Sequence, residues 1–181
     1  MSAGDPLLRR ARADDFAALH KLLCHPDVCR YLSDGAPPAP ERSRAWIAEA
    51  PVHAETHGGG LWLLAARDAQ RLGAVRLSPA EGAELELTYL LHPDAWGAGL
   101  ATRMAHTALG LAFASGPSPS VVAGADVPNA ASIAVMQRLG MAFRRDVRYP
   151  MGEGVEYTIT RDDFDLARIE SLPVDDQEAE P

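Results

Sequence analysis

Glu84-Leu85-Glu86-Leu87-Thr88-Tyr89-Leu90-Leu91 is followed closely by Trp96-Gly97-Ala98-Gly99-Leu100-Ala101-Thr102, and these two segments define the architecture expected of the chain. The first segment alternates and then becomes wholly apolar, which is typical of a strand. Beyond the second, Leu100, Met104, Ala108 and Leu111 recur at the spacing of one helix face, so a helix is expected over 100–114. A small-residue loop that opens a helix presents free backbone N–H groups at the positive end of the helix dipole, which suits phosphate.

An ordinary strand-to-helix turn is the alternative for this loop, because a glycine-rich loop alone is a weak signal. A second segment, Asn129 to Phe143, changes the balance between these two interpretations. Asn129 is a predicted N-cap of a helix over 129–139, and Gly140 stands where a left-handed residue usually ends a helix. A strand-like run at 120–125 precedes this helix, and another strand is expected after Met141.

This order of elements resembles the GNAT superfamily of N-acetyltransferases. The family's acyl-CoA loop, Gln/Arg-x-x-Gly-x-Gly/Ala, matches Trp96-x-x-Gly99-x-Ala101, with Trp96 departing from the usual first residue. The segments Pro26–Leu32, Glu41–Ile47 and His92–Gly97 are similar to the Rim-type branch, the ribosomal-protein N-terminal acetyltransferases. The resemblance covers residues 7–165. It implies an α/β (α+β) GNAT fold whose mixed central sheet of about six to seven strands is splayed at the acyl-CoA site and flanked by helices.

The length and the composition suit one acetyltransferase domain over 1–170, followed by an acidic, disordered tail over 171–181. The net charge of −8 argues against a nucleic-acid partner and is compatible with a cationic acceptor, although solubility alone also explains it. Residues 1–6 lack the apolar core of a signal peptide, and the 100–114 helix is too short to cross a bilayer. Two cysteines indicate reduced thiols, so we expect a cytoplasmic protein without a membrane partner.

One group of residues in the N-terminal segment has the spacing of a metal site. His20, Cys24, His25 and Cys29 have zinc-ligand spacing, but Pro26 would interrupt the helix, so no metal is expected. By fold analogy, the loops at 33–40 and 53–60 are expected to contact the acceptor.

The other elements are predicted from local patterns. They are strands at 7–12, 61–66, 73–77 and a closing 155–160, helices at 14–24, 41–50 and 162–171, a broken helical region at 26–32, and a turn at 68–70.

The resemblance assigns acetyl-CoA as the cosubstrate and implies which residues bind it. The backbone of Tyr89, Leu90 and Leu91 would hold the pantetheine arm, with their side chains as ordinary core residues. Asn129 would contact that arm or only cap its helix. Arg103 and Arg138 would meet phosphates, or lie solvated on their helices. The loop and the start of its helix would hold the pyrophosphate through Trp96, Gly97, Ala98, Gly99, Leu100, Ala101 and Thr102.

Two residues are the candidates for catalysis. Glu86 matches an acidic position of the Rim-type branch and would act as general base, directly or through a water. Glu84 shares its strand face and could raise its pKa, or both could lie on a solvated edge. Ser132 matches a serine of that branch and would protonate the departing thiolate, or would only bond backbone near the cap. Met136 stands where many superfamily members carry a tyrosine.

The leading hypothesis is therefore an acetyl-CoA-dependent N-acetyltransferase that acts by direct attack of a primary amine on the thioester. The acceptor would be a protein N-terminus or a small amine such as an amino acid or an antibiotic. An acyl-CoA-binding module without turnover is the alternative from another functional class, and Met136 favours it slightly. A transferase for longer acyl groups is a third hypothesis. A homodimer is compatible with all three.

Overall fold

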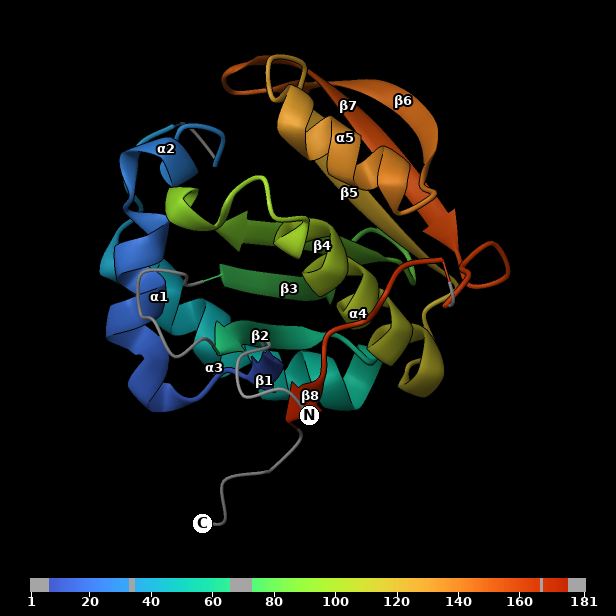
Figure 1. The fold of residues 1–181 in the computed structure, drawn as a ribbon, viewed down its shortest axis with the longest axis horizontal. Helices are drawn as coiled ribbons and strands as arrows, with labels where there is room; N and C mark the ends of the chain where they lie inside the picture. Colours follow the sequence, from blue (N-terminus) through green and yellow to red (C-terminus); the bar gives the residue numbers. More distant parts are fainter. Residues whose placement is uncertain (1–6, 33–34, 66–72, 167, 176–181) are drawn as a thin grey trace.

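The structure is a computed structural model that describes residues 7–32, 35–65, 73–166 and 168–175. The chain order of helices and strands is β1 Leu7–Arg10, α1 Phe16–Leu23, α2 Pro26–Cys29, α3 Pro40–His57, β2 Gly60–Ala65, β3 Gly73–Pro79, β4 Leu85–Leu91, α4 Leu100–Ser115, β5 Ser120–Asp126, α5 Ala130–Arg138, β6 Ala142–Tyr149, β7 Gly152–Thr160 and β8 Val174–Asp175 (Figure 1). Short 3₁₀ turns occupy Ala13–Asp15 and Pro93–Ala95.

The strands form one mixed sheet in the order β6-β7-β5-β4-β3-β2-β1-β8. The β4–β5 and β1–β8 pairs are parallel, and the others are antiparallel. This confirms the predicted mixed sheet flanked by helices. Eight strands lie in the described part, because the two-residue β8 adds to the expected six to seven. The strand predicted at 155–160 does not close the sheet: β7 lies between β5 and β6.

The sheet opens between β4 and β5. These strands pair only at Leu85 with Val121 and at Glu86 with Val122, whereas β4 pairs with β3 from Leu91 back to Leu85. Figure 1 shows β5 diverging from β4 toward the carboxyl end of β4. Beyond Glu86, the β5-facing edge of β4 has no strand partner among the residues that the structure describes, as the predicted splay requires.

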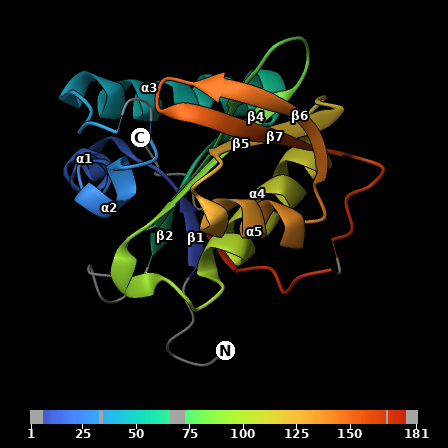
Figure 2. The ribbon, with the colours of Figure 1, turned by 90° about the horizontal axis from the view of Figure 1, so that it is seen from above.

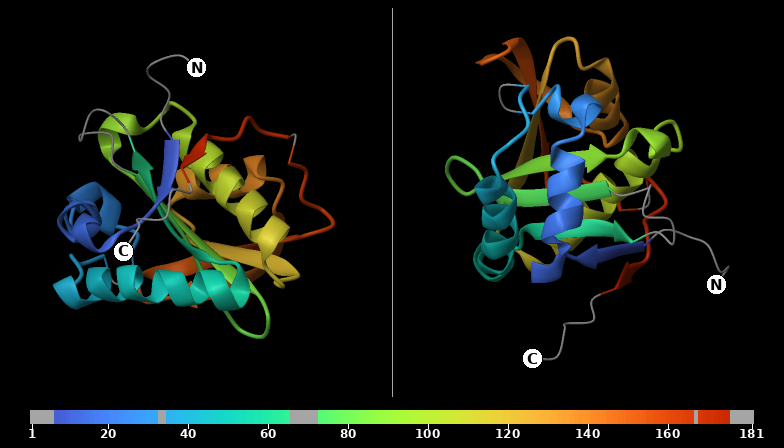
Figure 3. Two further views of the ribbon diagram at one scale, coloured as in Figure 1. Left: turned by 90° about the horizontal axis from the view of Figure 1, so that it is seen from below. Right: turned by 90° about the vertical axis from the view of Figure 1, so that its left-hand side faces the viewer.

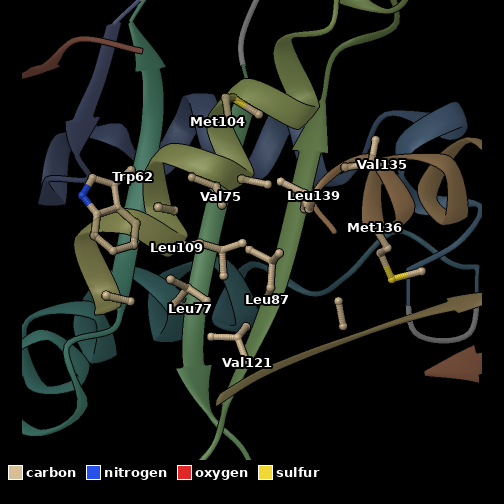
Figure 4. Packing of buried hydrophobic residues seen from close by; sticks show 14 of the residues in the cluster. Trp62, Val75, Leu77, Leu87, Met104, Leu109, Val121, Val135, Met136 and Leu139 are labelled. Carbon is tan, nitrogen blue, oxygen red and sulfur yellow. The ribbon is translucent and has the colours of Figure 1, made fainter. Parts of the chain in front are cut away.

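Helices cover both faces of the sheet. Figures 2 and 3 show α1 and α3 on one face and α4 and α5 on the other. Each face has its own buried cluster, and β4 contributes to both through alternation: Leu87 packs with the α4 cluster, while Leu90 packs with the α1–α3 cluster. In the α4 cluster, α5 contributes Val135 and Met136 (Figure 4). Alternate side chains of β4 therefore pack into the two hydrophobic clusters, one on each face of the sheet.

Two helices differ from their predicted bounds. The α3 helix continues through Pro51 to His57 instead of ending near 50, and the left-handed Gly58 (φ 74°) ends it. The final helix expected at 162–171 is absent from the described residues of that segment. Instead, the segment forms turns and bends that pack against α4, where the Asp165 carbonyl lies 3.1 Å from Nε2 of the buried His106.

The first residues of the segment predicted as a tail, 171–175, pack against the fold. Leu172 is buried, and its N–H donates to the Thr107 hydroxyl at 2.8 Å. Val174 and Asp175 then pair with β1 as β8, because an open sheet edge provides unpaired backbone groups. Residues 176–181 lie outside the described residues, as do residues 1–6 and the turn predicted at 68–70.

Candidate active site

A cleft of about 1520 Å³ lies where β4 and β5 separate. It extends from the start of α4 to the side of the sheet covered by α3. Of the predicted site residues, Ala98 alone does not line it. Those that do are Glu86, Tyr89, Leu90, Leu91, Trp96, Gly97, Gly99, Leu100, Ala101, Thr102, Arg103, Asn129, Ser132 and Arg138.

The loop before α4 owes its glycines to backbone conformation. Gly97 and Gly99 have φ values of 77° and 72°, a region that residues with a Cβ rarely adopt. A Cβ at either position would meet nothing within 4 Å, so crowding is not the reason. Gly99 is the N-cap of α4, and the first backbone bond within the helix runs from Arg103 N–H to the Gly99 carbonyl. The preceding N–H groups therefore face the cleft end without helical acceptors, as an anion site requires.

Trp96 anchors this loop to the sheet. Its indole Nε1 donates to the Leu91 carbonyl at 2.8 Å, while 54% of the residue stays exposed. The sequence gives no signal for this bond, because it depends on how the 3₁₀ turn at Pro93–Ala95 folds the chain back. The indole thus ties the loop to the end of β4 through a hydrogen bond that could not be expected from the Gln or Arg usual at this position of the motif.

Arginines gather at the α4–α5 end of the cleft. Arg103 donates to the Glu170 carbonyl at 3.2 Å and lies 3.6 Å from the Glu170 carboxylate. Arg138 lines the cleft beside Arg168, whose Nε donates to the Arg138 carbonyl at 3.0 Å. The sequence analysis did not identify Arg168, because it lies in the segment expected to form the final helix at 162–171 and belongs to no site motif.

Tyr89 and Ser132 form the closest polar contact inside the cleft. The Tyr89 hydroxyl lies 2.7 Å from the Ser132 hydroxyl and donates to the Ser132 carbonyl at 2.9 Å. Burial raises the pKa of Tyr89 to about 12, so the phenol keeps its proton at any ordinary pH. The Tyr89 ring packs against the α4-side cluster, as expected of a core residue, and its hydroxyl in addition reaches the cleft. Met136 is fully buried in the α4-side cluster and does not line the cleft.

Asn129 holds the start of α5. Its Oδ1 accepts the Ser132 N–H at 3.2 Å, which confirms the predicted N-cap. The same bond fixes the backbone of Ser132 at the cleft wall, so capping and presentation of the serine come from one side chain.

The two glutamates of the β4 segment have different environments. Glu86 is exposed and lines the cleft, with no hydrogen bond or ion pair to any residue that the structure describes. Glu84 accepts from the Ser120 hydroxyl at 2.7 Å and pairs with Arg144 at 2.7 Å, and Arg144 lowers the pKa of Glu84. Glu84 is therefore held by the β5–β6 side of the sheet, whereas Glu86 faces the cleft.

Residues of α2 and α3, rather than the loops expected to contact the acceptor, line the cleft on the α3 side of the sheet. Of the residues described within 35–40 and 53–60, none lines the cleft; α2 and α3 contribute instead. Arg76 and Arg42 lie over the Trp46 ring, at 5.0 and 5.8 Å from its centroid. Arg76 also pairs with Glu49 at 3.0 Å, and burial lowers its pKa.

A family model for the acetyltransferase (GNAT) domain matches residues 7–142. The chain belongs to the GNAT acetyltransferase family. The fold, the splayed sheet and the loop before α4 thus agree with the family that the sequence resembles.

Solved structures share this GNAT fold at low sequence identity. The RimL ribosomal L7/L12 α-N-protein acetyltransferase in complex with coenzyme A is 17% identical, with a TM-score of 0.71 over 86% of this chain and 94% of that one. The yncA protein of Salmonella typhimurium with its cofactor acetyl-CoA is 17% identical, with a TM-score of 0.68 over 89% and 96%. The aminoglycoside acetyltransferase AAC(6')-Ib in complex with coenzyme A is 17% identical, with a TM-score of 0.69 over 91% and 99%.

Within the described part of this GNAT chain, no helix is long and apolar enough to cross a membrane. The described residues also contain no group of three or more His, Cys, Asp or Glu side chains that could hold a metal ion. Among the residues with zinc-ligand spacing, Cys24 Sγ lies 3.6 Å from His20 Nε2, whereas His25 caps α2 by accepting the Asp27 N–H.

Proposed function

We propose that this GNAT protein transfers the acetyl group of acetyl-CoA to a primary amine, by direct attack of the amine on the thioester. The observation that carries the proposal is the placement of three groups at the β4–β5 opening. Glu86 lies on one face of β4, the Tyr89–Ser132 pair lies on the other, and the loop before α4 lies at the end of the same strand. A base and a hydroxyl thus flank one opening from opposite sides.

Backbone groups would hold most of the cosubstrate. The N–H groups at the start of α4, from Gly99 to Thr102, would bind the pyrophosphate at the positive helix end. The unpaired edge of β4 beyond Glu86 would bind the amides of the pantetheine arm as an added strand does. Arg138 and Arg168 would neutralise the remaining phosphate.

The chemistry needs one proton removed and one supplied. Glu86 accepts a proton from the attacking amine through a water, while the new C–N bond forms. Backbone N–H groups of residues 89–91 would stabilise the oxyanion of the tetrahedral intermediate. When the C–S bond breaks, the electron pair stays on sulfur, the Ser132 hydroxyl donates its proton to the thiolate, and a solvent water returns a proton to the serine oxygen. Tyr89 orients that hydroxyl and stays protonated, since its pKa is about 12.

The proposed acceptor is a protein N-terminus or a small amine. Motifs in the N-terminal half support placement in the Rim-type branch, and a similar fold occurs in an acetyltransferase that acts on a ribosomal protein and in one that acts on aminoglycosides. Those acceptors belong to the other proteins. A cytoplasmic location and a homodimer stay predictions.

Two measurements test the proposal. Acetyl-CoA should raise the melting temperature, because a ligand that binds only the native state stabilises it by mass action. Thiol release should then be measured with a panel of primary amines, with acetyl-CoA compared against longer acyl-CoAs. No thermal shift with millimolar acetyl-CoA would contradict the proposal. A shift without thiol release for any amine would support the acyl-CoA-binding module instead.

A further inference from the structure

The ring of Tyr149 occupies a position that two glycines make available. Tyr149 ends β6, and its ring crosses β7 toward β5 over Gly154 and Gly124. A Cβ on Gly124 would overlap the Tyr149 hydroxyl, and a Cβ on Gly154 would overlap the ring. Because Gly124 and Gly154 have no side chains, the Tyr149 hydroxyl can reach the cleft wall, where Gly124 and Tyr149 both line the opening.

Three polar groups on this wall lack partners. Asp126, the last residue of β5, is only 9% exposed, and its buried Oδ1 has no hydrogen-bond partner in the described structure. The Tyr149 hydroxyl and the Glu86 carboxylate likewise have no hydrogen bond to described residues. An unpaired buried carboxylate is costly, and that cost falls when a ligand donates hydrogen bonds to it.

The wall is also negatively charged. Burial raises the pKa of Tyr149, and the carboxylates of Glu156, Glu86 and Asp126 raise it further, so these charges surround a phenol that keeps its proton. The nearest cation on β3, Arg76, is already paired with Glu49. Glu156 is paired with Arg144 and Arg145, whereas Glu86 and Asp126 have no ion pair to a described residue, so an incoming cation meets these two carboxylates.

We propose that Asp126, Tyr149 and Glu86 bind the protonated amine of the acceptor, and that they select primary amines without an adjacent carboxylate over free amino acids. This rests on the proposed function. An ammonium ion has three N–H donors, which match one oxygen from each of the three residues. A carboxylate two bonds from the nitrogen would face Asp126 and Glu86, and like charges at that separation repel. Neutral neighbours, such as the amide of a peptide N-terminus, avoid this repulsion.

Asp126→Asn tests the site with a matched control. Glycinamide and glycine serve as acceptors that differ in the group beside the amine, and Asp146→Asn makes the same change on an exposed residue of β6 outside the cleft. We expect Asp126→Asn to raise the KM for glycinamide about 10- to 100-fold, the value of a charge-assisted hydrogen bond. The preference for glycinamide over glycine should fall by a similar factor. The acetyl-CoA affinity and the kinetics of Asp146→Asn should stay at wild-type values.

Tyr149→Phe provides a second variant, because it keeps the ring over the two glycines and removes only the hydroxyl. We expect its KM for glycinamide to rise about 5- to 10-fold, as for a neutral hydrogen bond. Unchanged KM values in both variants would overturn the inference. So would a preference for glycine in the wild type that Asp126→Asn leaves intact.

A binding measurement separates this inference from the proposed function. Glycinamide is titrated calorimetrically into the wild-type and Asp126→Asn complexes with coenzyme A, where no turnover occurs. Weaker binding of glycinamide to the variant supports the site even if the wild type releases no thiol. Absence of thiol release would contradict only the proposed function. Binding that is equal in the two proteins, or absent from both, overturns the inference whatever the turnover.

Discussion

The Tyr89 hydroxyl lies 2.7 Å from the Ser132 hydroxyl, and this contact joins β4 to α5 across the opening of the sheet. In many superfamily members, α5 itself carries a tyrosine where this chain has the buried Met136. Here the phenol comes from β4 instead. A phenol and a serine hydroxyl therefore still meet in the cleft, although α5 contributes only the serine.

We expect Tyr89→Phe and Ser132→Ala each to lower kcat about 10-fold, with the KM for acetyl-CoA unchanged, because the serine acts mainly in the transition state. The double variant should lose little beyond either single variant, since the two hydroxyls act as one unit. Because the Tyr89 pKa is about 12, wild type and Tyr89→Phe should have pH profiles of the same shape between pH 6 and 10. Steady-state thiol release measures all of these values.

Tyr157→Phe is the matched control for this pair, since the Tyr157 hydroxyl contacts only Gln137, at 3.4 Å, and does not line the cleft. It should keep the wild-type kcat. Full activity of well-folded Ser132→Ala would show that departure of the thiolate needs no side-chain acid.

Glu86→Gln should lower kcat about 100-fold and leave acetyl-CoA binding intact, because it removes the base and keeps the shape. Glu84→Gln makes the same change on the same strand face. It should leave kcat unchanged and cost at most about 1 kcal/mol of stability, since it weakens a partly exposed pair with Arg144. Thiol release and thermal melts distinguish these effects. Equal kcat values for wild type and Glu86→Gln would remove Glu86 from the mechanism.

Gly99→Glu should abolish the thermal shift caused by acetyl-CoA, because it adds a negative charge where the pyrophosphate would bind. Gly99→Ala separates charge from conformation: at φ 72° a Cβ costs about 1 kcal/mol, but it meets open space. The alanine variant should therefore melt a few degrees lower and keep the acetyl-CoA shift. A shift retained by Gly99→Glu would place the phosphates elsewhere.

Asp15 predicts a dependence of stability on pH. Burial alone would raise the pKa of Asp15, but bonds from Arg9 (2.6 and 2.7 Å) and from the Arg12 N–H (2.7 Å) lower it on balance. A lowered pKa stabilises the fold above the unfolded value, and this is lost as pH falls through the folded value. Asp15→Asn should thus cost about 1 kcal/mol at pH 7 and less below about pH 4. Urea unfolding from pH 3 to 7 measures the difference, and a constant gap would contradict the assignment.

Local patterns predicted the elements that depend on nearby residues. The alternation before Leu91, the glycines at 97 and 99 and the cap at Asn129 predicted the part of the cleft that we propose binds acetyl-CoA, because helix starts and strand faces follow short-range rules. The final helix expected at 162–171 failed, because packing against α4 overrides local preference there. The extra strand β8 depends on an edge that only the assembled sheet offers.

By itself, the sequence determined the family, the order of strands and helices from β1 to β7 and the loop before α4, since each depends on residues close together in the chain. Only the tertiary structure decided which side chains meet. Tyr89 reaches Ser132, Trp96 reaches the Leu91 carbonyl, and Glu84 turns away to Arg144 while Glu86 stays in the cleft. The physical reason is the divergence of β5 from β4, which opens a cleft between residues that no local pattern connects.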